Sequence, residues 1–364
     1  MRFISTSDPV MHNTDAELDL LLRDMDEADP QYRPTAFWRT ALDRLIPELG
    51  DGGLQRFRSL PGPLSFFVPT YGFPGIHTTP ARFTPLRHAL ENLELGDRRC
   101  SIHLERLLTG EAQAESDYRV LCAADQPLRP PFLDQFSEGE AAAPIEQFEF
   151  DGRRFGRSSL NYLLGLAFLK RHCDLSEVRT VLEIGGGFGS LGEILLADKR
   201  NDVFYINADI PPTVHCAHHY LSTTHGRNSI LGYAESRNEK VLDISAMRAS
   251  HRAATLAAWQ LPRLQGTVDL FVNFISFQEM EPDVVCNYLG QIKRLQARYI
   301  LLRNLREGKA KATPGTVGVI DPIKGEMYDE FLGQSYRLVA CNTVPFGYRT
   351  VDGFHSELRV YERR

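Results

Sequence analysis

The stretch Thr180–Leu196, "TVLEIGGGFGSLGEILL", joins an apolar run to a leucine-rich run through a turn crowded with glycines. Its first part, residues 180–185, predicts a buried strand, and residues 190–199 predict a helix. Glu183 stands near the end of that strand. A glycine-rich turn between a strand and a helix is typical of nucleotide sites in α/β proteins. The sequence therefore predicts a nucleotide-binding turn here.

The rest of the C-terminal part repeats this alternation. Residues 202–211, 268–276 and 298–305 predict further apolar strands, and residues 160–175, 213–224 and 282–296 predict helices between them. Largely apolar strands that alternate with helices indicate a parallel sheet covered on both faces. Residues 337–364 predict an antiparallel hairpin at the sheet edge. The third strand is ambiguous, because residues 230–245 and 254–264 both fit. The predicted fold is α/β, a Rossmann-like, mostly parallel seven-stranded sheet with a C-terminal antiparallel hairpin.

The first 150 residues show a different pattern of apolar residues. Helical spacing of apolar residues predicts helices at 14–29, 34–49, 84–95 and 100–110, while the Pro- and Gly-rich segment 56–75 predicts irregular packed chain. Residues 123–150 predict a connector. We therefore expect a mainly helical domain over 1–150, for acceptor binding, dimerisation or both, and a second domain over 151–364.

The bulk composition excludes several classes of protein. The net charge is -6 with no basic cluster, which argues against nucleic-acid binding. No apolar run approaches membrane-spanning length, and the first 22 residues lack the apolar core of a secretion signal. The six cysteines lie far apart, as in proteins of a reducing compartment, and a zinc site is improbable. The sequence predicts a cytoplasmic protein.

Two cofactors fit the glycine turn. Gly187, Gly189 and Gly192 form the G-x-G-x-x-G pattern of dinucleotide sites, while Glu183 begins the pattern E-x-G-x-G-x-G. A carboxylate at that position suits the ammonium of a methionine moiety and repels a pyrophosphate. Asp209, at the end of the second strand, suits ribose hydroxyls in either case. Glu183 therefore favours S-adenosylmethionine (SAM) over NAD.

Other residues complete the predicted cofactor site. Trp259 and Gln260 follow one candidate for the third strand and would flank adenine; Glu235 or Asp243 would accept from its amino group if the other candidate forms that strand. Arg157, ahead of the first strand, would bind the methionine carboxylate. The predicted cofactor-binding set is Glu183, Gly185, Gly186, Gly187, Gly189, Asp209, Trp259, Gln260, Asn273 and Arg157.

Two further stretches carry a family resemblance. "VLEIGGGFG" with "ADIP" resembles the class I SAM-dependent methyltransferases over about residues 155–364. "DLFVNFISFQEMEPDVVCNYL" followed by "YILLRNLREGK" resembles the bacterial putative sugar O-methyltransferases, and the N-terminal "FW" and "FRS" segments do so less specifically. The resemblance implies methyl transfer to the hydroxyl of a sugar, free, nucleotide-linked or attached to a glycan or natural product.

Methyl transfer is an in-line displacement that needs a positioned acceptor and, for a hydroxyl, a base. Glu279 is the first candidate for the base, and Gln278 and His355 are the other predicted catalytic residues. The Ser276 and Glu281 side chains equally fit helix caps ahead of Pro282. Lys309 and Lys311 fit a solvated loop. The predicted acceptor-binding residues are Ser276, Met280, Arg303, Asn304 and Tyr162.

Several alternatives stay open at this point. In the first alternative, the enzyme methylates a nitrogen or carbon atom of a small metabolite or peptide. In the second, the chain is a non-catalytic module that binds SAM or a nucleotide. In the third, it is an NAD oxidoreductase. A metal is not predicted, since Glu279, Glu281 and Asp283 would point in different directions from a helix start. The predicted partners are a small-molecule or glycan acceptor and a second copy of the chain, with no nucleic acid and no membrane.

Overall fold

The computed structural model describes residues 16–50, 52–72, 85, 88–89, 92, 98–313 and 317–364. Five neighbouring parallel strands form the middle of the large sheet. Each strand is buried over nearly all of its length, because its residues are mostly apolar and point into both faces of the sheet. They are β3 (Thr180–Ile184), β4 (Phe204–Asp209), β7 (Ala253–Ala257), β9 (Leu270–Phe274) and β10 (Tyr299–Leu305).

The sheet runs in the order β11-β13-β10-β9-β3-β4-β7-β5, with β12 paired to β13. Every pairing from β10 to β5 is parallel, whereas β13 is antiparallel to β10, β11 and β12. The added strands are β5 (Ile230–Leu231), β11 (Tyr336–Asn342), β12 (Tyr348–Arg349) and β13 (His355–Arg363). This confirms the predicted α/β fold of the class I methyltransferase type. The short strands β5 and β12 give nine strands rather than seven.

The ambiguity over the third strand is resolved. Residues 253–257 form the central strand β7, beside β4, while residues 230–231 supply only the two-residue edge strand β5. The difference follows from composition, since Ala253–Ala257 is fully buried and apolar except for Thr255, whereas residues 232–241 contain six charged or polar side chains.

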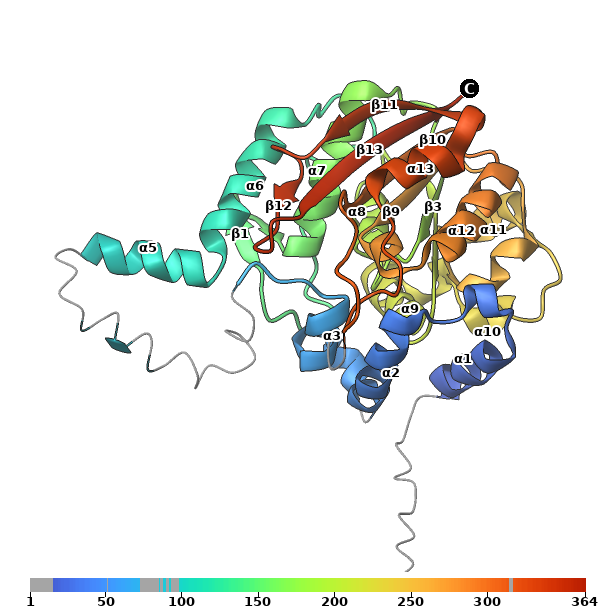
Figure 1. The fold of residues 1–364 in the computed structure, drawn as a ribbon, viewed down its shortest axis with the longest axis horizontal. Coiled ribbons are helices and arrows are strands. Elements are labelled where there is room, and N and C mark those ends of the chain that lie inside the picture. The colour runs from blue at the N-terminus through green and yellow to red at the C-terminus, as the bar shows by residue number, and fades with distance from the viewer. Residues whose placement is uncertain are drawn as a thin grey trace, which may run out of the picture.

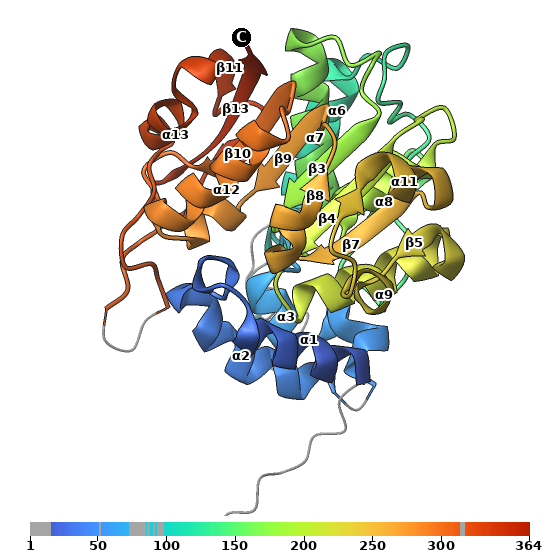
Figure 2. The same ribbon diagram turned by 90° about the vertical axis from the view of Figure 1, so that its right-hand side faces the viewer.

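Helices cover both faces of the sheet (Figure 2). One layer contains α7, α8 and α9, which contact one another in turn, and the other contains α12 and α13. The helices of this part are α7 (Arg157–His172), α8 (Ser190–Ala197), α9 (Thr213–His225), α10 (Tyr233–Ser236), α11 (Ile244–Ser250), α12 (Pro282–Arg294) and α13 (Gly325–Leu332). Short 3₁₀ helices are η3 (Arg227–Ser229), η4 (Ala258–Arg263), η5 (Ser276–Glu279) and η6 (Gly333–Ser335), and β6 (Leu242–Asp243) pairs with β8 (Leu264–Gln265).

The N-terminal part is helical, as predicted (Figure 1). Its elements are α1 (Ala16–Glu27), η1 (Pro30–Tyr32), α2 (Ala36–Leu49), η2 (Gly53–Ser59), α3 (Pro61–Phe66), α5 (Arg98–Leu108) and α6 (Glu111–Ala124). The prediction of irregular chain over 56–75 is corrected for its first part, because Pro61 starts α3 at a position where proline is favourable. Residues 73–75 and most of the predicted helix 84–95 lie outside the described residues.

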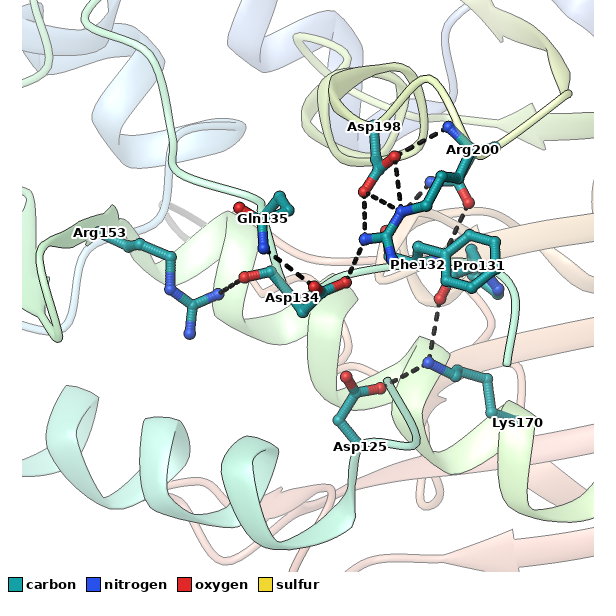
Figure 3. Close-up of polar contacts among 10 residues, drawn as sticks. Asp125, Pro131, Phe132, Asp134, Gln135, Arg153, Lys170, Asp198 and Arg200 are labelled. Atoms are coloured by element: carbon teal, nitrogen blue, oxygen red, sulfur yellow. Dashed lines mark hydrogen bonds and ion pairs between the residues drawn. The ribbon is translucent and has the colours of Figure 1, made fainter. Parts of the chain in front are cut away.

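The segment 123–150 is not a loose connector. Residues 130–132 lie near the ends of the strands opposite the glycine turn, and side chains of the C-terminal part, among them Lys170 and Arg200, bond the segment (Figure 3). The Asn201 amide accepts from Phe132 N (2.8 Å) and donates to Phe132 O (3.1 Å). Lys170, whose side chain is fully buried, donates to Asp125 (2.6 Å). The segment then forms β1 (Phe148–Phe150), which pairs with β2 (Arg153–Phe155).

One hydrophobic core joins all these elements. Residues of α1, α2 and α6 belong to the same buried cluster as the strands of the large sheet. Figures 1 and 2 show α1, α2 and α3 packed together against one end of the sheet. Of the helices in the described ranges, none has the length and apolar character needed to cross a membrane.

Candidate functional site

A cavity lies where the carboxyl ends of β3, β4 and β9 meet the N-terminal helices. Its empty volume, counted together with open solvent at its mouth, is about 1060 Å³. Residues from three parts of the chain line it: Arg33, Pro34, Thr35, Trp38, Phe66, Phe67 and Pro69; Ser158, Asn161, Tyr162, Gly185, Gly186, Gly187, Phe188, Ser190, Asp209 and Ile210; and Ala258, Phe274, Ile275, Ser276, Glu279, Met280, Val284 and Tyr288.

The glycine turn forms the floor of this cavity. Gly185, Gly187 and Gly189 have φ of 68°, 56° and 91°, a region that side-chain-bearing residues rarely adopt. A Cβ on Gly185 would lie 2.0 Å from Ser276 Oγ, so the turn packs directly on the end of β9. A Cβ on Gly187 would meet nothing closer than 3.8 Å, so this glycine opens the backbone toward the cavity. The turn can therefore approach a ligand closely.

Glu183 lies beneath the turn rather than on the cavity wall. Its carboxyl is fully buried, and the Tyr205 hydroxyl donates to Oε2, while Oε1 has no hydrogen-bond partner. A Cβ on Gly186 would come within 2.5 Å of Glu183 Oε2, so only the glycine backbone separates this carboxyl from the cavity. Burial raises the pKa of Glu183 to about 7, and the nearby charge of Asp209 adds to the rise.

Asp209 ends β4 and lines the cavity. Its carboxylate accepts from Ile210 N (2.7 Å) and Gly187 N (2.9 Å), which fixes its direction toward the glycine turn. Burial raises the pKa of Asp209 to about 7, despite the opposing effect of these backbone donors. Two carboxyl groups that are both costly to ionise thus lie at one end of the cavity.

The two carboxyls and the open glycine turn fit SAM. A cation placed here would stabilise both ionised carboxylates, and Glu183 Oε1 has an unfilled acceptor position for an N–H donor. Asp209 keeps acceptor capacity for ribose hydroxyls, since each of its oxygens takes a single backbone bond. A pyrophosphate would instead meet two carboxyls and no described cation among the residues at this end of the cavity.

Ile275 sits at the end of β9 in a strained conformation. Its φ is 72° and its ψ is -36°, which is unfavourable for a β-branched residue. The turn is held by Asn273, whose amide donates to Ile184 O (2.9 Å) and to Ser276 Oγ (2.6 Å). This backbone conformation of Ile275 directs the following residues, Ser276 to Glu279, across the cavity mouth.

Glu279 is the carboxylate on the wall facing the glycine turn. Its side chain is buried, and Oε1 accepts from Lys309 Nζ (2.7 Å). Thr35 Oγ1 donates to the Glu279 backbone oxygen (2.9 Å), which ties α2 to η5. Burial raises the pKa of Glu279, with the Lys309 ammonium opposing the rise. Lys309, expected in a solvated loop, is thus a site residue.

The sequence predicts that the N-terminal part serves in acceptor binding, but it does not identify the residues that form the N-terminal wall of the cavity. Trp38 and Phe66 pack together at 6.2 Å between ring centroids, and Phe67 lies beside them on the cavity surface. The one signal for these residues was the density of aromatic side chains in 37–67, which indicates burial but not the surface that is covered. Nothing in their spacing points to a site at the far end of a sheet.

Three of the predicted polar residues support the site through hydrogen bonds without lining the cavity. Gln278 Oε1 accepts from Leu305 N (2.8 Å), and its own N–H donates to Asn304 Oδ1 (3.2 Å). Asn304 Nδ2 donates in turn to Asn273 Oδ1 (3.1 Å). None of Gln278, Asn304 and Asn273 lines the cavity, because their amides bond the ends of β9 and β10 to η5.

Two predicted cationic residues and His355 lie away from the cavity. Arg303 is fully buried and donates to Asn161 O (2.9 Å) and to Phe346 O, so it joins β10 to α7 and the terminal hairpin. Arg157 donates to Thr70 O (2.6 Å). His355 Nδ1 lies 2.6 Å from Glu307 Oε1 at the start of β13. All three side chains are engaged in holding segments together.

The predicted adenine contacts are also internal. Gln260 is fully buried, with Oε1 accepting from Ala257 N (2.8 Å) and Nε2 donating to Ser236 Oγ (3.1 Å). Trp259 Nε1 donates to the Tyr233 hydroxyl (3.3 Å). It is the preceding residue, Ala258, that lines the cavity. Tyr162, Ser276 and Met280 line the cavity, and their role in binding the acceptor stays a prediction.

Within the described ranges, no group of three or more His, Cys, Asp or Glu side chains could hold a metal ion. Glu235 and Asp243, the alternative adenine acceptors, do not line the cavity either. Asp243 caps α11 by accepting from Ala246 N (2.8 Å). The side chains on the cavity wall that carry a charge are therefore Arg33, Asp209 and Glu279.

The sequence matches no protein-family model and no curated protein. Among solved structures, the mitomycin 7-O-methyltransferase is similar at 13% identity, over 57% of this chain and 58% of that one, with a TM-score of 0.35. The magnesium protoporphyrin IX methyltransferase of Synechocystis PCC 6803 with bound SAM is similar at 13% identity, over 57% and 81%, with a TM-score of 0.36.

A third similar structure is an O-methyltransferase from neocarzinostatin biosynthesis, in complex with S-adenosyl-L-homocysteine and 1,4-dihydroxy-2-naphthoic acid. Its identity is 14%, over 57% of this chain and 59% of that one, with a TM-score of 0.36. The chain thus spans less than two thirds of the mitomycin and neocarzinostatin proteins.

Proposed function

We propose that this chain is a SAM-dependent methyltransferase that transfers the methyl group to a hydroxyl. The observation that carries the proposal is one cavity with two chemical ends. At one end lie the glycine turn and the raised-pKa carboxyls of Glu183 and Asp209, and at the other lies the buried carboxylate of Glu279. A cationic donor suits the first end, and a hydroxyl that must lose a proton suits the second.

The chain's own residues divide the binding of the donor. Asp209 accepts from the ribose hydroxyls, and the Glu183 carboxyl, buried beneath Gly186, attracts the ammonium through its negative charge. Ile210 and Ala258 contact adenine from the ends of β4 and β7, and Gly187 allows the amino acid part to lie against the backbone. When bound, SAM supplies a methyl group activated by its positively charged sulfur.

Glu279 acts on the acceptor. Besides Lys309, the Trp38 side chain hydrogen-bonds this carboxyl, and because a carboxylate has further lone pairs it can still accept a hydrogen bond from an acceptor hydroxyl and take the proton as the oxygen attacks. Lys309 opposes the rise in the pKa of Glu279 and fixes the direction of its side chain. The strained turn at Ile275 and the amides of Gln278, Asn304 and Asn273 position Glu279, and the Trp38 wall excludes water from the methyl group.

The identity of the hydroxyl compound is a separate question. The resemblance over residues 269–289 and 299–309 implied a sugar, so sugars are included in the panel of acceptors. The amides of Gln278 and Asn304, which that resemblance placed near the acceptor, bond other protein groups: Gln278 Oε1 accepts from Leu305 N, and Asn304 accepts from the backbone N–H of Gln278 and donates to Asn273 Oδ1. Incubation with labelled SAM and a panel of sugars, phenols, amines and active-methylene compounds tests the acceptor atom. Methyl groups found only on nitrogen or carbon would contradict the proposal.

The affinity for SAM and for S-adenosyl-L-homocysteine is expected to rise with pH across pH 7. Glu183 and Asp209 have a pKa of about 7 in the free protein, so both become largely protonated below that pH. A cationic ligand binds their ionised forms, so affinity falls by up to about tenfold per pH unit for each group as the pH drops. Calorimetric titration of the protein with each ligand from pH 5.5 to 8.5 measures this change in affinity.

Matched variants separate the two carboxyls. Glu183→Gln and Asp209→Asn should each weaken binding at pH 8 and flatten the pH dependence. Glu193→Gln is the control, since Glu193 is a buried acid on α8 that bonds the Tyr220 hydroxyl and does not line the cavity. Binding of NAD in place of SAM would contradict the proposed function.

A further inference from the structure

We infer that the acceptor is a planar aromatic compound that carries its hydroxyl on the ring, a phenol or a naphthol rather than a sugar. This inference rests on the proposed function and adds the chemical class of the second ligand. It follows from what lines the cavity on the side away from the glycine turn, where the wall is built by the N-terminal segment 33–69.

That wall is aromatic. Trp38 and Phe66 lie 6.2 Å apart between ring centroids, and Phe37 packs edge-on against both, at 6.0 Å and 6.1 Å. Tyr162 and Phe274 also line the cavity and stack on each other at 4.7 Å with an interplanar angle of 13°. Aromatic rings in the lining of a cavity favour an occupant that is itself flat and apolar, because ring contacts add to the burial of apolar surface.

The polar groups of the same wall are already committed. Thr35 Oγ1 donates to the Glu279 backbone oxygen, and Arg33 Nε donates to Ala28 O (2.6 Å). Lys309 Nζ bonds Glu279 Oε1 and lies 3.8 Å from the centroid of the Phe37 ring. The Trp38 side chain also hydrogen-bonds the Glu279 carboxyl, so this wall offers the acceptor the remaining lone pairs of that carboxyl and the outer nitrogens of Arg33.

The free polar groups on this wall favour one acceptor class. A pyranose brings several hydroxyls, and burying any of them without a partner is unfavourable. A phenol or naphthol brings one hydroxyl, which the Glu279 carboxylate can accept from, and an apolar ring that the wall of Trp38 and Phe66 covers. The aromatic hydroxyl therefore matches both this carboxylate and the rings.

The test is direct binding of 2-naphthol, followed by its fluorescence, to the full chain with and without S-adenosyl-L-homocysteine. Methyl α-D-glucopyranoside is the sugar probe, measured by competition and by calorimetry. We expect 2-naphthol to bind and the glucoside not to compete. Trp38→Leu and Phe66→Leu should each weaken naphthol binding by about tenfold and leave the affinity for S-adenosyl-L-homocysteine unchanged.

Phe148→Leu is the matched control, because Phe148 is an aromatic residue of β1 in the ring cluster with Tyr71 and Phe150, outside the cavity. Glucoside binding, or naphthol binding that is insensitive to Trp38 and Phe66, overturns the inference. If S-adenosyl-L-homocysteine binds and 2-naphthol does not, the inference alone fails. If 2-naphthol binds and S-adenosyl-L-homocysteine does not, the proposed function fails and the aromatic chemistry of the cavity stands.

Discussion

Glu279→Gln is expected to lower the rate constant of methyl transfer by about 10²–10⁴-fold, the range that general bases supply. The change keeps the size of the side chain and its place on η5 but removes the site that takes the proton. Single-turnover measurements with labelled SAM, on the acceptor that the panel identifies, separate the transfer step from binding. The affinity for S-adenosyl-L-homocysteine should be unchanged, because Glu279 lies on the other wall from Glu183.

Glu281→Gln is the control for this experiment. Glu281 lies two residues away at the start of α12 and does not line the cavity, and its neutralisation is the same change of charge. The rate constant of methyl transfer in the Glu281→Gln variant should stay within about twofold of the wild-type value. The loss of transfer rate in the Glu279→Gln variant should also be smaller for acceptors whose hydroxyl is already ionised, because those acceptors need no base. An equal loss for such acceptors would show that Glu279 acts by shape alone.

Asp125→Ala is expected to lower the free energy of unfolding by about 3–5 kcal/mol, the cost of leaving one partner of a buried ion pair alone. Lys170 is the partner left behind, with its side chain fully buried, and Pro131 O is then its one remaining acceptor among the described residues. Urea unfolding followed by circular dichroism measures the change. Burial lowers the pKa of Lys170, so the cost should shrink as the pH rises and the amine loses its proton.

Two further variants check that the buried pair is the cause. Asp134→Ala removes another ion pair from the same segment, with Arg200, but both groups are partly exposed and the expected cost is below about 1 kcal/mol (Figure 3). Lys170→Met combined with Asp125→Leu should recover most of the stability lost by Asp125→Ala. Equal effects of Asp125→Ala and Asp134→Ala would show that the segment is held mainly by its apolar contacts.

The sheet could be predicted because its signal is local. The segments that become β3, β4, β9 and β10 are mostly apolar in the sequence, and glycine or proline closely follows β3 and β4. The segment 123–150 could not be predicted, because its four prolines and scattered acids resemble those of a linker. Its role depends on Asn201 and Lys170, which lie far along the chain and have no pattern of their own.

For the site, the sequence located the right turns but not the direction of each side chain. Glu279 and Gln278 follow the same strand, yet one faces the cavity and the other bonds Leu305 N, because η5 rotates successive residues by a third of a turn. Arg303 precedes Asn304 on a strand, and both point into the protein. Lys309 could be paired with Glu279 only once β9 and β10 were placed side by side.

The N-terminal segment supplies one wall of the cavity and none of the residues at the glycine turn. Exchanging residues 33–69 for those of a relative would therefore change the shape of the compartment next to Glu279 and leave Gly185, Gly187 and Asp209 untouched. Such an arrangement permits new specificities to arise by recombination or drift in a short stretch of chain, while the donor-handling half is inherited intact.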